Sequence, residues 1–184
     1  MRHLLLLGVV AGLAAGCSCE EAETLGSLSE AERGALQVVD AAALKALLAS
    51  HQGKIVVLAA WSVRQEGGVA LHAALASLAE RSGEDGLAVV ALNLDTLADV
   101  RRKVLPVLRK QRPAFTSCVL DGEQMMILGL TDPDWGGLLP AVWLFDTKGK
   151  LAASFYGAEA LGKATAGLER LRRPAPRARP ARDG

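Results

Sequence analysis

The sequence lacks several features that would each indicate a class of protein. No segment repeats at a solenoid or propeller period, which excludes a repeat architecture. The longest apolar run, residues 4–16, has 13 residues, fewer than the roughly 20 that a transmembrane helix needs. Aromatic residues are scarce at 4%, although 51% of the chain is hydrophobic. What is left is a globular protein, and 184 residues are enough for one domain with a sizeable core and short appendages.

Net charge is nearly absent, at +1, but the charges are unevenly distributed. Residues 170–184 contain six Arg and one Asp, whereas residues 17–169 contain 14 Lys and Arg against 19 Asp and Glu. A negative body argues against nucleic-acid binding, which needs a basic face on the folded domain. The Pro- and Arg-rich residues 172–184 are expected to form a disordered tail.

Cysteine is also scarce, and the first of the three follows a secretory leader. A short positive end, "MRH", precedes the apolar run, and small residues precede Cys17. The stretch "LAAGC" resembles the lipobox of bacterial lipoproteins, which implies removal of residues 1–16 and attachment of lipid to Cys17. We therefore expect a protein anchored in the cell envelope, on the inner or outer membrane. Secretion without lipid and an uncleaved anchor are the alternatives.

The other two cysteines are Cys19 and Cys118. An oxidising envelope permits a disulfide between them, but sequence does not show whether they are close. Cys19 lies in an acidic segment, residues 17–35, that is expected to be a flexible tether. Cys118 lies in an apolar strand, where an inert buried thiol is expected. The Cys17-x-Cys19 pair has no His or second Cys pair nearby, so we expect no metal site and no cofactor.

Hydrophobic periodicity predicts alternating strands and helices. Asp40 and Asp95 are placed to cap helices, and Pro106 is expected to kink the helix that contains it. Because strands and helices alternate in the first half, the sheet is expected to be parallel there. The predicted strands are 35–39, 54–61, 86–95 and 114–121, with a hairpin over 140–157, and the predicted helices are 41–51, about 66 onward, 96–112 and 158–172.

Three segments carry a resemblance to the thioredoxin superfamily, and in particular to its membrane-anchored TlpA/ResA branch. They are "GKIVVLAAWS", "VVALNLD" and "DPDWGGLLPAVWLFDTKGKL". The resemblance covers Leu36 to Leu171 and implies a thioredoxin-like domain over residues 36–171. The fold it implies is a three-layer α/β/α fold with a helix–strand insertion, whose mixed sheet ends in a β-hairpin and a C-terminal helix.

The residues that carry out the family's chemistry are missing. On this resemblance the two redox cysteines fall on Ser62 and Gln65. The reaction needs a thiolate at a helix N-terminus and a second thiol to resolve the mixed disulfide, which a hydroxyl and an amide do not supply. Carboxylates found in many members fall on Val56 and Gly68. We expect no catalytic residue in this degenerate motif, which consists of Trp61, Ser62, Val63, Arg64 and Gln65.

The resemblance leaves one binding feature in place. Pro140 matches the family's cis-proline, and the backbone of the preceding residue, Leu139, matches the position that holds an extended substrate segment. Because this contact uses main-chain groups and shape, it can persist without the cysteines. We predict a peptide groove bounded by Trp61, Ser62, Val63, Leu139 and Pro140. The alternative is that Trp61 only packs and Pro140 only sets a turn.

These features support three hypotheses. The first is an envelope-anchored, non-catalytic binding or scaffolding module for an extracytoplasmic protein or peptide. The second is a thiol-disulfide oxidoreductase or peroxidase-like protein that works through Cys118 or Cys19. The third is a spacer with no binding role. Sequence names no partner and gives no oligomeric state.

Two histidines and two basic segments have simpler interpretations. His72 falls just off the apolar stripe of its helix and is expected at the solvent flank, too far from Ser62 to act as its base. His51 lies near a helix C-terminus, where its charge suits the dipole. The basic helix "DVRRKVLPVLRKQR" and the Arg-rich tail either contact anionic lipid or cell-wall polymer, or are simply solvated.

Overall fold

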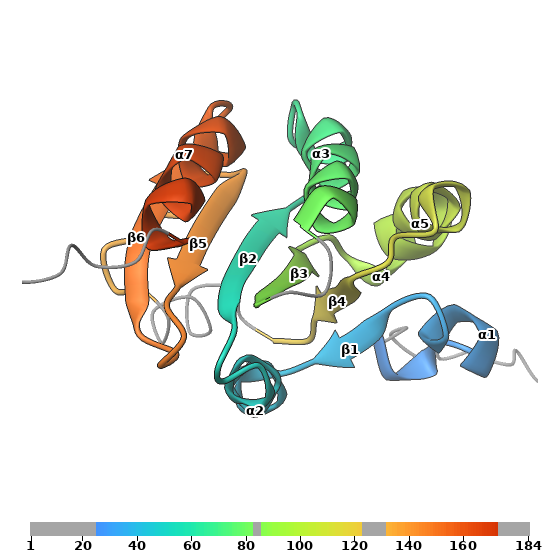
Figure 1. The fold of residues 1–184 in the computed structure, drawn as a ribbon. Helices are drawn as coiled ribbons and strands as arrows, with labels where there is room; N and C mark the ends of the chain where they lie inside the picture. The colour runs from blue at the N-terminus through green and yellow to red at the C-terminus, as the bar shows by residue number, and fades with distance from the viewer. Residues whose placement is uncertain (1–24, 83–85, 123–131, 173–184) are drawn as a thin grey trace, which may run out of the picture.

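The computed structural model describes residues 25–82, 86–122 and 132–172, and these form one six-stranded sheet between two layers of helices (Figure 1). The strands are β1 (Gln37–Val39), β2 (Ile55–Trp61), β3 (Leu87–Asn93), β4 (Thr116–Leu120), β5 (Ala141–Phe145) and β6 (Leu151–Tyr156). The helical segments are η1 (Leu25–Ser27), α1 (Glu30–Arg33), α2 (Ala41–Ser50), α3 (Gly68–Ser82), α4 (Leu97–Asp99), η2 (Val100–Val104), α5 (Leu105–Gln111) and α7 (Ala160–Arg172).

The strand order is β1-β4-β3-β2-β5-β6. The first four strands in this order are parallel, and β5 and β6 form an antiparallel hairpin beside β2. The helix–strand pair α5–β4 places its strand between β1 and β3, which is the insertion that the sequence predicted. The mixed sheet, the hairpin and the C-terminal helix are therefore confirmed.

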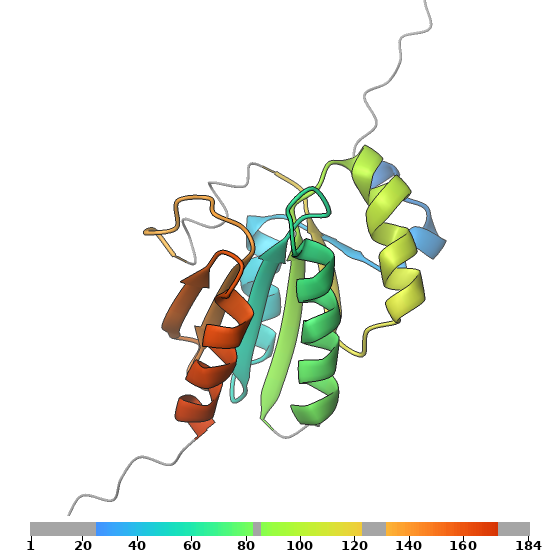
Figure 2. The same ribbon diagram turned by 90° about the horizontal axis from the view of Figure 1, so that it is seen from above.

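Each face of the sheet buries a separate core because successive side chains of a strand point to opposite sides. Along β2, Val57, Ala59 and Trp61 join the cluster beneath α3, α5 and α7, whereas Leu58 and Ala60 join the cluster that α2 covers. All seven residues of β2 and all seven of β3 are buried, as expected of central parallel strands. Figure 2 shows α3 and α7 side by side over the sheet, with α5 beyond α3.

The helix caps follow the prediction in one case and depart from it in another. Asp40 caps α2, because its side chain accepts a hydrogen bond of 2.8 Å from Ala43 N. Asp95 does not cap a helix: the residue at the N-cap of α4 is Thr96, and it makes no side-chain capping bond. The carboxylate of Asp95 is used at the site described below.

Of the two outcomes expected at Pro106, a kink or a split, the helix is not split. Residues 97–111 form one continuous run in which η2 is a π-helical turn, where Leu105 N donates to Val100 O five residues back. This wider turn directly precedes Pro106, whose ring has no N–H to donate.

The domain begins earlier than predicted. Residues 17–35 were expected to be a tether, but η1 and α1 lie within that range. Leu25 and Leu28 are buried in the core beneath α5, at 9% and 3% exposure. Ser29 and Glu32 form a capping box at the start of α1. The described domain therefore includes residues 25–35.

Candidate functional site

The site lies at the carboxyl edge of the sheet, where β2 and β3 end side by side. Trp61 at the end of β2 pairs in parallel with Asn93 at the end of β3. The residues that follow the two strands, Ser62 and Asp95, are consequently brought together although they are 33 positions apart in the chain. This edge is where open α/β sheets place their functional side chains.

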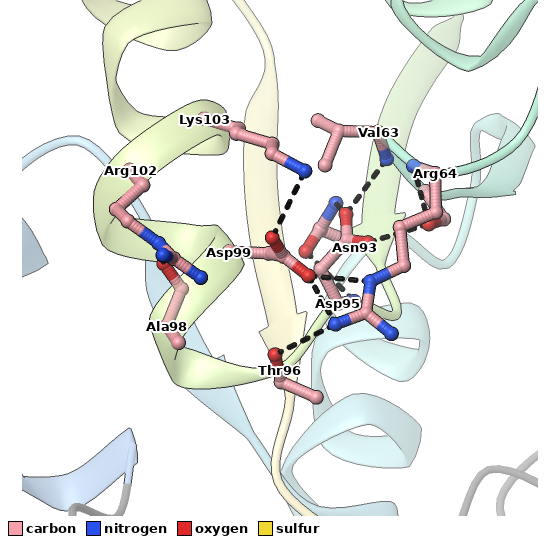
Figure 3. Close-up of polar contacts among 10 residues, drawn as sticks. Val63, Arg64, Asn93, Asp95, Thr96, Ala98, Asp99, Arg102 and Lys103 are labelled. Carbon is pink, nitrogen blue, oxygen red and sulfur yellow. Dashed lines mark hydrogen bonds and ion pairs between the residues drawn. The ribbon is translucent and has the colours of Figure 1, made fainter.

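The hydroxyl of Ser62 donates a hydrogen bond to Asp95 Oδ1, and both residues are buried. Asp95 Oδ2 accepts hydrogen bonds from Val63 N at 2.8 Å and from Asn93 Nδ2 at 2.7 Å. Ser62 Oγ also accepts from Arg64 N at 3.0 Å. Figure 3 shows this network linking the chain after β2 to the chain after β3. The side-chain oxygens of Ser62 and Asp95 thus all have partners, and the group that faces the Ser62 hydroxyl is a carboxylate that two N–H groups also engage.

A second carboxylate extends the network toward solvent. The Arg64 side chain, 62% exposed, reaches across to the buried carboxylate of Asp99, which is 3% exposed (Figure 3). Lys103 Nζ approaches the other oxygen of Asp99 at 3.2 Å. The hydrogen bond from Arg64 lowers the pKa of Asp99; burial opposes this and Lys103 adds to it. Asp99 is therefore held as a carboxylate, and its ion pair fixes the side chain of Arg64.

The segment after Ser62 does not open the helix directly, and α3 begins two residues after the predicted start at about residue 66. Two successive turns follow β2, closed by Gln65 N to Ser62 O at 3.3 Å and by Gly68 N to Gln65 O at 3.0 Å. Helix α3 begins only at Gly68. A Cβ atom at Gly68 would lie 2.0 Å from Ser62 O, so only glycine permits this turn. Residue 62 thus lies in a turn before the helix and not at its first residues, where redox proteins place their low-pKa thiol.

The peptide bond between Leu139 and Pro140 is cis. Antiparallel pairing of Ala60 with Ala141 places Pro140, the residue before Ala141, beside the end of β2 and hence beside the motif. This juxtaposition agrees with the predicted position of the cis-proline. Within the described residues no backbone hydrogen bond uses the N–H or C=O of Leu139.

The loop that ends at this bond is held by Asp132, which is 4% exposed. Asp132 Oδ2 accepts hydrogen bonds from Trp143 Nε1 at 2.9 Å and from the Tyr156 hydroxyl. Burial alone would raise the pKa of Asp132, but hydrogen bonds from Tyr156, Ser154 and Trp143 outweigh it, and the pKa is lowered. The carboxylate ties the loop to the hairpin.

A hollow of about 790 Å³ separates α3 from α7 beside the motif. Leu139 and Pro140 form one end of it, and Gln65, Glu66 and Gly67 line it from the motif side. Its walls are largely apolar or small, and they consist of Ala70, Leu71, Ala74, Ser77, Leu78, Ala158, Leu161, Gly162 and Thr165.

Of the five residues predicted to bound the groove, Leu139 and Pro140 line it, whereas Trp61, Ser62 and Val63 do not, which corrects the prediction. Trp61 is 1% exposed and belongs to the core beneath α3. Its ring lies 4.8 Å from that of His72, which is itself fully buried rather than at the solvent flank. The ring nitrogens of His72 contact Gln111 and, at 3.4 Å, Ser117. Burial lowers the pKa of His72, and the contact with Gln111 partly opposes this.

The thiols and histidines offer no alternative centre in the part of the chain that is described. Cys118 is a free thiol on β4 with no exposed surface, and burial raises its pKa to about 12. Cys17 and Cys19 lie outside the described residues. Within 25–82, 86–122 and 132–172, no group of three His, Cys, Asp or Glu side chains is placed to hold a metal ion. In the same ranges, no helix is both long and apolar enough to cross a bilayer.

Comparison with known proteins gives the fold but no closer relation. No protein-family model and no curated protein matches the sequence. Solved structures do match it. The fold is thioredoxin-like. A thioredoxin-like superfamily protein matches at TM-score 0.51 and 26% identity, over 70% of this chain and 87% of its own.

Two further structures agree. A protein of Neisseria meningitidis assigned as a thioredoxin matches at TM-score 0.53 and 20% identity, over 69% of this chain and 80% of its own. A protein of Chlorobium tepidum assigned as the thiol:disulfide interchange protein DsbE matches at TM-score 0.53 and 21% identity, over 67% and 84%. The chain thus resembles thiol-disulfide oxidoreductases in fold, and its described residues contain no pair of cysteines.

Sequence reasoning missed the three acidic residues that organise this site, Asp95, Asp99 and Asp132. A signal for Asp95 was available, because it follows a buried parallel strand just as Ser62 does. Asp99 and Asp132 gave no such signal: their partners, Arg64 and the pair Trp143 and Tyr156, are far from them in sequence.

Proposed function

We propose that this protein is an envelope-anchored, non-catalytic binding module that holds an extended segment of an extracytoplasmic protein. The observation that carries the proposal is the hollow between α3 and α7, which retains the Leu139–Pro140 edge beside a motif without a thiol. An open hollow and a motif without a thiol are compatible, since a groove that lacks the reactive cysteine can still bind a peptide.

The motif supports binding without chemistry. The Ser62 hydroxyl is occupied by Asp95, and Gln65 offers only an amide. The Asp95 carboxylate that accepts from Ser62 is itself engaged by N–H groups of Val63 and Asn93, and resolving a mixed disulfide needs a second thiol. A thiol reaction through Cys118 is disfavoured because that sulfur has no exposed surface. The turns over residues 62–67 nevertheless hold one rim of the hollow in place.

The hollow suits an extended peptide. Within the described residues, the backbone N–H and C=O of Leu139 make no backbone hydrogen bond. Both groups can therefore pair with an extended peptide, in the way that peptides add to an exposed strand edge. Leu138 is 57% exposed and Val69 is 40% exposed, so apolar surface is available near both rims. Apolar side chains of the bound segment would enter between Ala74 and Leu161.

The envelope location rests on the leader and on Cys17. The lipobox-like "LAAGC" stretch supports lipid attachment at that sulfur, and a lipid anchor would concentrate the groove near envelope proteins. Metabolic labelling with a fatty acid tests this part alone: the label should enter the wild-type chain and not Cys17→Ser.

Site-specific photocrosslinking in cells that express the full chain tests the binding role. A photoreactive amino acid at Gln65, on the rim of the hollow, should give a discrete adduct with an envelope protein. The same group at Lys148, which is exposed on the face that α2 covers, should not.

A variant that fills the hollow sharpens the test. Gly162 faces open space, so Gly162→Leu should fill the hollow and abolish the Gln65 adduct without disturbing the fold. Ala49→Leu makes a matched change on α2 and should leave the adduct intact. Equal adducts from Gln65 and Lys148, or an adduct that survives Gly162→Leu, would rule out the groove as the binding surface.

A further inference from the structure

A second hollow, of about 820 Å³, lies on the opposite side of α3 from the peptide groove, between the end of α1 and the C-terminal end of α5. It is open to solvent and is lined by two stretches of chain, residues 33–37 and residues 108–117. Figures 1 and 2 both place α1 beside α5 at the edge of the molecule that carries β1. No part of the proposed peptide-binding role uses this surface.

Three exposed arginines, Arg33, Arg109 and Arg112, line the hollow, and its lining contains no Asp or Glu. No ion pair joins any of the three to a carboxylate of the described residues. Glu32, which precedes Arg33 on α1, is engaged by Ser29 and lies 3.5 Å from Arg101, although Arg109 also acts on its charge. Arg33 donates one hydrogen bond to Gly26 O, and its other N–H groups, like the exposed guanidinium groups of Arg109 and Arg112, are available to an external anion.

Arg112 is held at the rim by its backbone. It caps α5 in a left-handed conformation at φ 44°, and its N–H donates to Leu108 O at 2.8 Å. A non-glycine residue adopts this conformation at some cost, which the capping bond offsets. Pro113 follows directly and also lines the hollow, so the chain turns there with Arg112 at the turn.

Charge is segregated toward this edge of the molecule. The segments 25–37 and 97–117, which form the edge, contain seven Lys and Arg and three Asp and Glu. The rest of residues 17–169 contains seven Lys and Arg against 16 Asp and Glu. Since the rest of residues 17–169 is strongly acidic, an anionic surface would attract the edge formed by segments 25–37 and 97–117 and would repel the rest of the domain.

The edge is also the part of the described chain closest in sequence to the proposed lipid. Leu25 packs beside α5 and lies eight residues after Cys17. Eight residues span at most about 28 Å when fully extended. A lipid on Cys17 would therefore keep the edge within a short distance of the bilayer, where a phosphate headgroup meets guanidinium groups in favourable geometry.

We propose that the hollow formed by residues 33–37 and 108–117 binds the phosphate groups of anionic phospholipids through Arg33, Arg109 and Arg112. This contact would orient the domain so that the groove between α3 and α7 stays accessible at the membrane surface. This proposal rests on the proposed lipid attachment, which brings the edge near the membrane. It concerns a different surface from the peptide groove, so the two proposals can be tested separately.

Hydrogen exchange of the full chain on lipid vesicles tests this proposal. Vesicles of phosphatidylcholine are compared with vesicles that also contain phosphatidylglycerol. We expect amides of residues 33–37 and 108–117 to exchange roughly tenfold more slowly on the anionic vesicles, and the difference to disappear at high salt. Any leader or lipid anchor contributes equally to both samples, so the difference reports the headgroup charge.

Matched variants decide which surface is responsible. The triple variant Arg33→Gln, Arg109→Gln, Arg112→Gln should lose the slowing. Lys45→Gln, Lys148→Gln, Lys150→Gln removes the same charge from α2 and from the turn between β5 and β6, and this variant should keep the slowing. Equal exchange on both kinds of vesicle, or slowing that survives the arginine substitutions, overturns the proposal.

Two further outcomes would assign the hollow to another occupant. If inorganic phosphate alone slows exchange of the same amides at equal concentration, the hollow is a small-anion site rather than a membrane contact. If the amides are already slow without vesicles, and Glu20→Gln, Glu21→Gln, Glu23→Gln makes them fast, the chain's own acidic residues fill it. Loss of the Gln65 crosslink would bear on the peptide groove and not on this contact.

Discussion

At the scale of single residues, the main contrast with redox relatives is the environment of position 62. A nucleophilic thiol there needs surroundings that favour its anion, usually a helix N-terminus or a nearby cation. Here Ser62 Oγ accepts from Arg64 N but also faces the carboxylate of Asp95, and α3 begins six residues later. The Asp95 charge therefore opposes an anion at position 62, whichever residue stands there.

Restoring the cysteines should accordingly fail to restore reactivity. In Ser62→Cys, Gln65→Cys, we expect Asp95 to raise the pKa of the new thiol at 62 above the ordinary value of about 8.5. The pH dependence of alkylation at position 62, followed by peptide mass spectrometry, measures it. Adding Asp95→Asn should move the alkylation midpoint to lower pH. A midpoint below pH 7 with Asp95 intact would contradict this account of the site.

His72 gives a second prediction at this scale. Its folded pKa lies below its unfolded value of about 6.5, so the unfolded chain binds more protons as the pH falls below that value. The free energy of unfolding should therefore be largest above pH 6.5 and decrease as the solution becomes more acidic. Thermal unfolding across pH 5–7.5 measures the slope.

Two variants separate the histidines in this test. His72→Phe keeps an aromatic ring against Trp61 and should flatten the slope, even though the protein is less stable overall. His51, whose pKa burial and Lys54 also lower, serves as the comparison: His51→Phe should keep the part of the slope that His72 supplies. An unchanged slope in His72→Phe would show that the ring titrates freely.

At the scale of elements, the motif has become two turns instead of the first turn of a helix. The chain leaves β2, turns twice through residues 62–67 and only then enters α3. The turn packs the backbone of Gly68 directly on the carbonyl of Ser62. This contact explains the glycine at position 68, because no side chain fits there.

Gly68→Ala should therefore destabilise the domain. A methyl group at this position must displace the backbone at Ser62, and overpacking of this kind costs about 1–3 kcal/mol. Gly162→Ala is the control, since it faces open space within α7 and should stabilise by about 0.5–1 kcal/mol. Urea unfolding of both variants measures the difference. A neutral Gly68→Ala would mean that residues 62–67 rearrange without cost.

At the scale of the whole molecule, the sheet separates the described thiol from the peptide groove. The single described thiol, Cys118, is in β4 between β1 and β3, and its side chain lies in the core that α2 covers. The peptide groove lies between α3 and α7 on the other face. A substrate in the groove has no path to this sulfur in the folded protein.

The native protein should therefore show no thiol reactivity from Cys118. With a pKa of about 12, only about one thiol in 10,000 is ionised at pH 8, and none is exposed. Iodoacetamide should modify Cys118 only after denaturant is added. Reduction of a disulfide-bonded test protein should proceed at the rate of the Cys118→Ala variant. Turnover that Cys118→Ala abolishes would restore the oxidoreductase hypothesis.

The sequence by itself determined the order and type of the elements, because the period of the apolar residues differs between helices and strands. It also placed Pro140 near Ser62, through the resemblance that "DPDWGGLLP" carries. Both are properties of short segments and their order along the chain.

Only the tertiary structure decided what surrounds those residues. Asp95 bonds to Ser62 instead of capping a helix, His72 lies beneath α3, and Trp61 turns into the core. Each outcome depends on which strands are neighbours and on the space between packed layers. Contacts between residues more than 30 positions apart leave no periodic trace in a single sequence, and it is these contacts that determine the chemistry of the site.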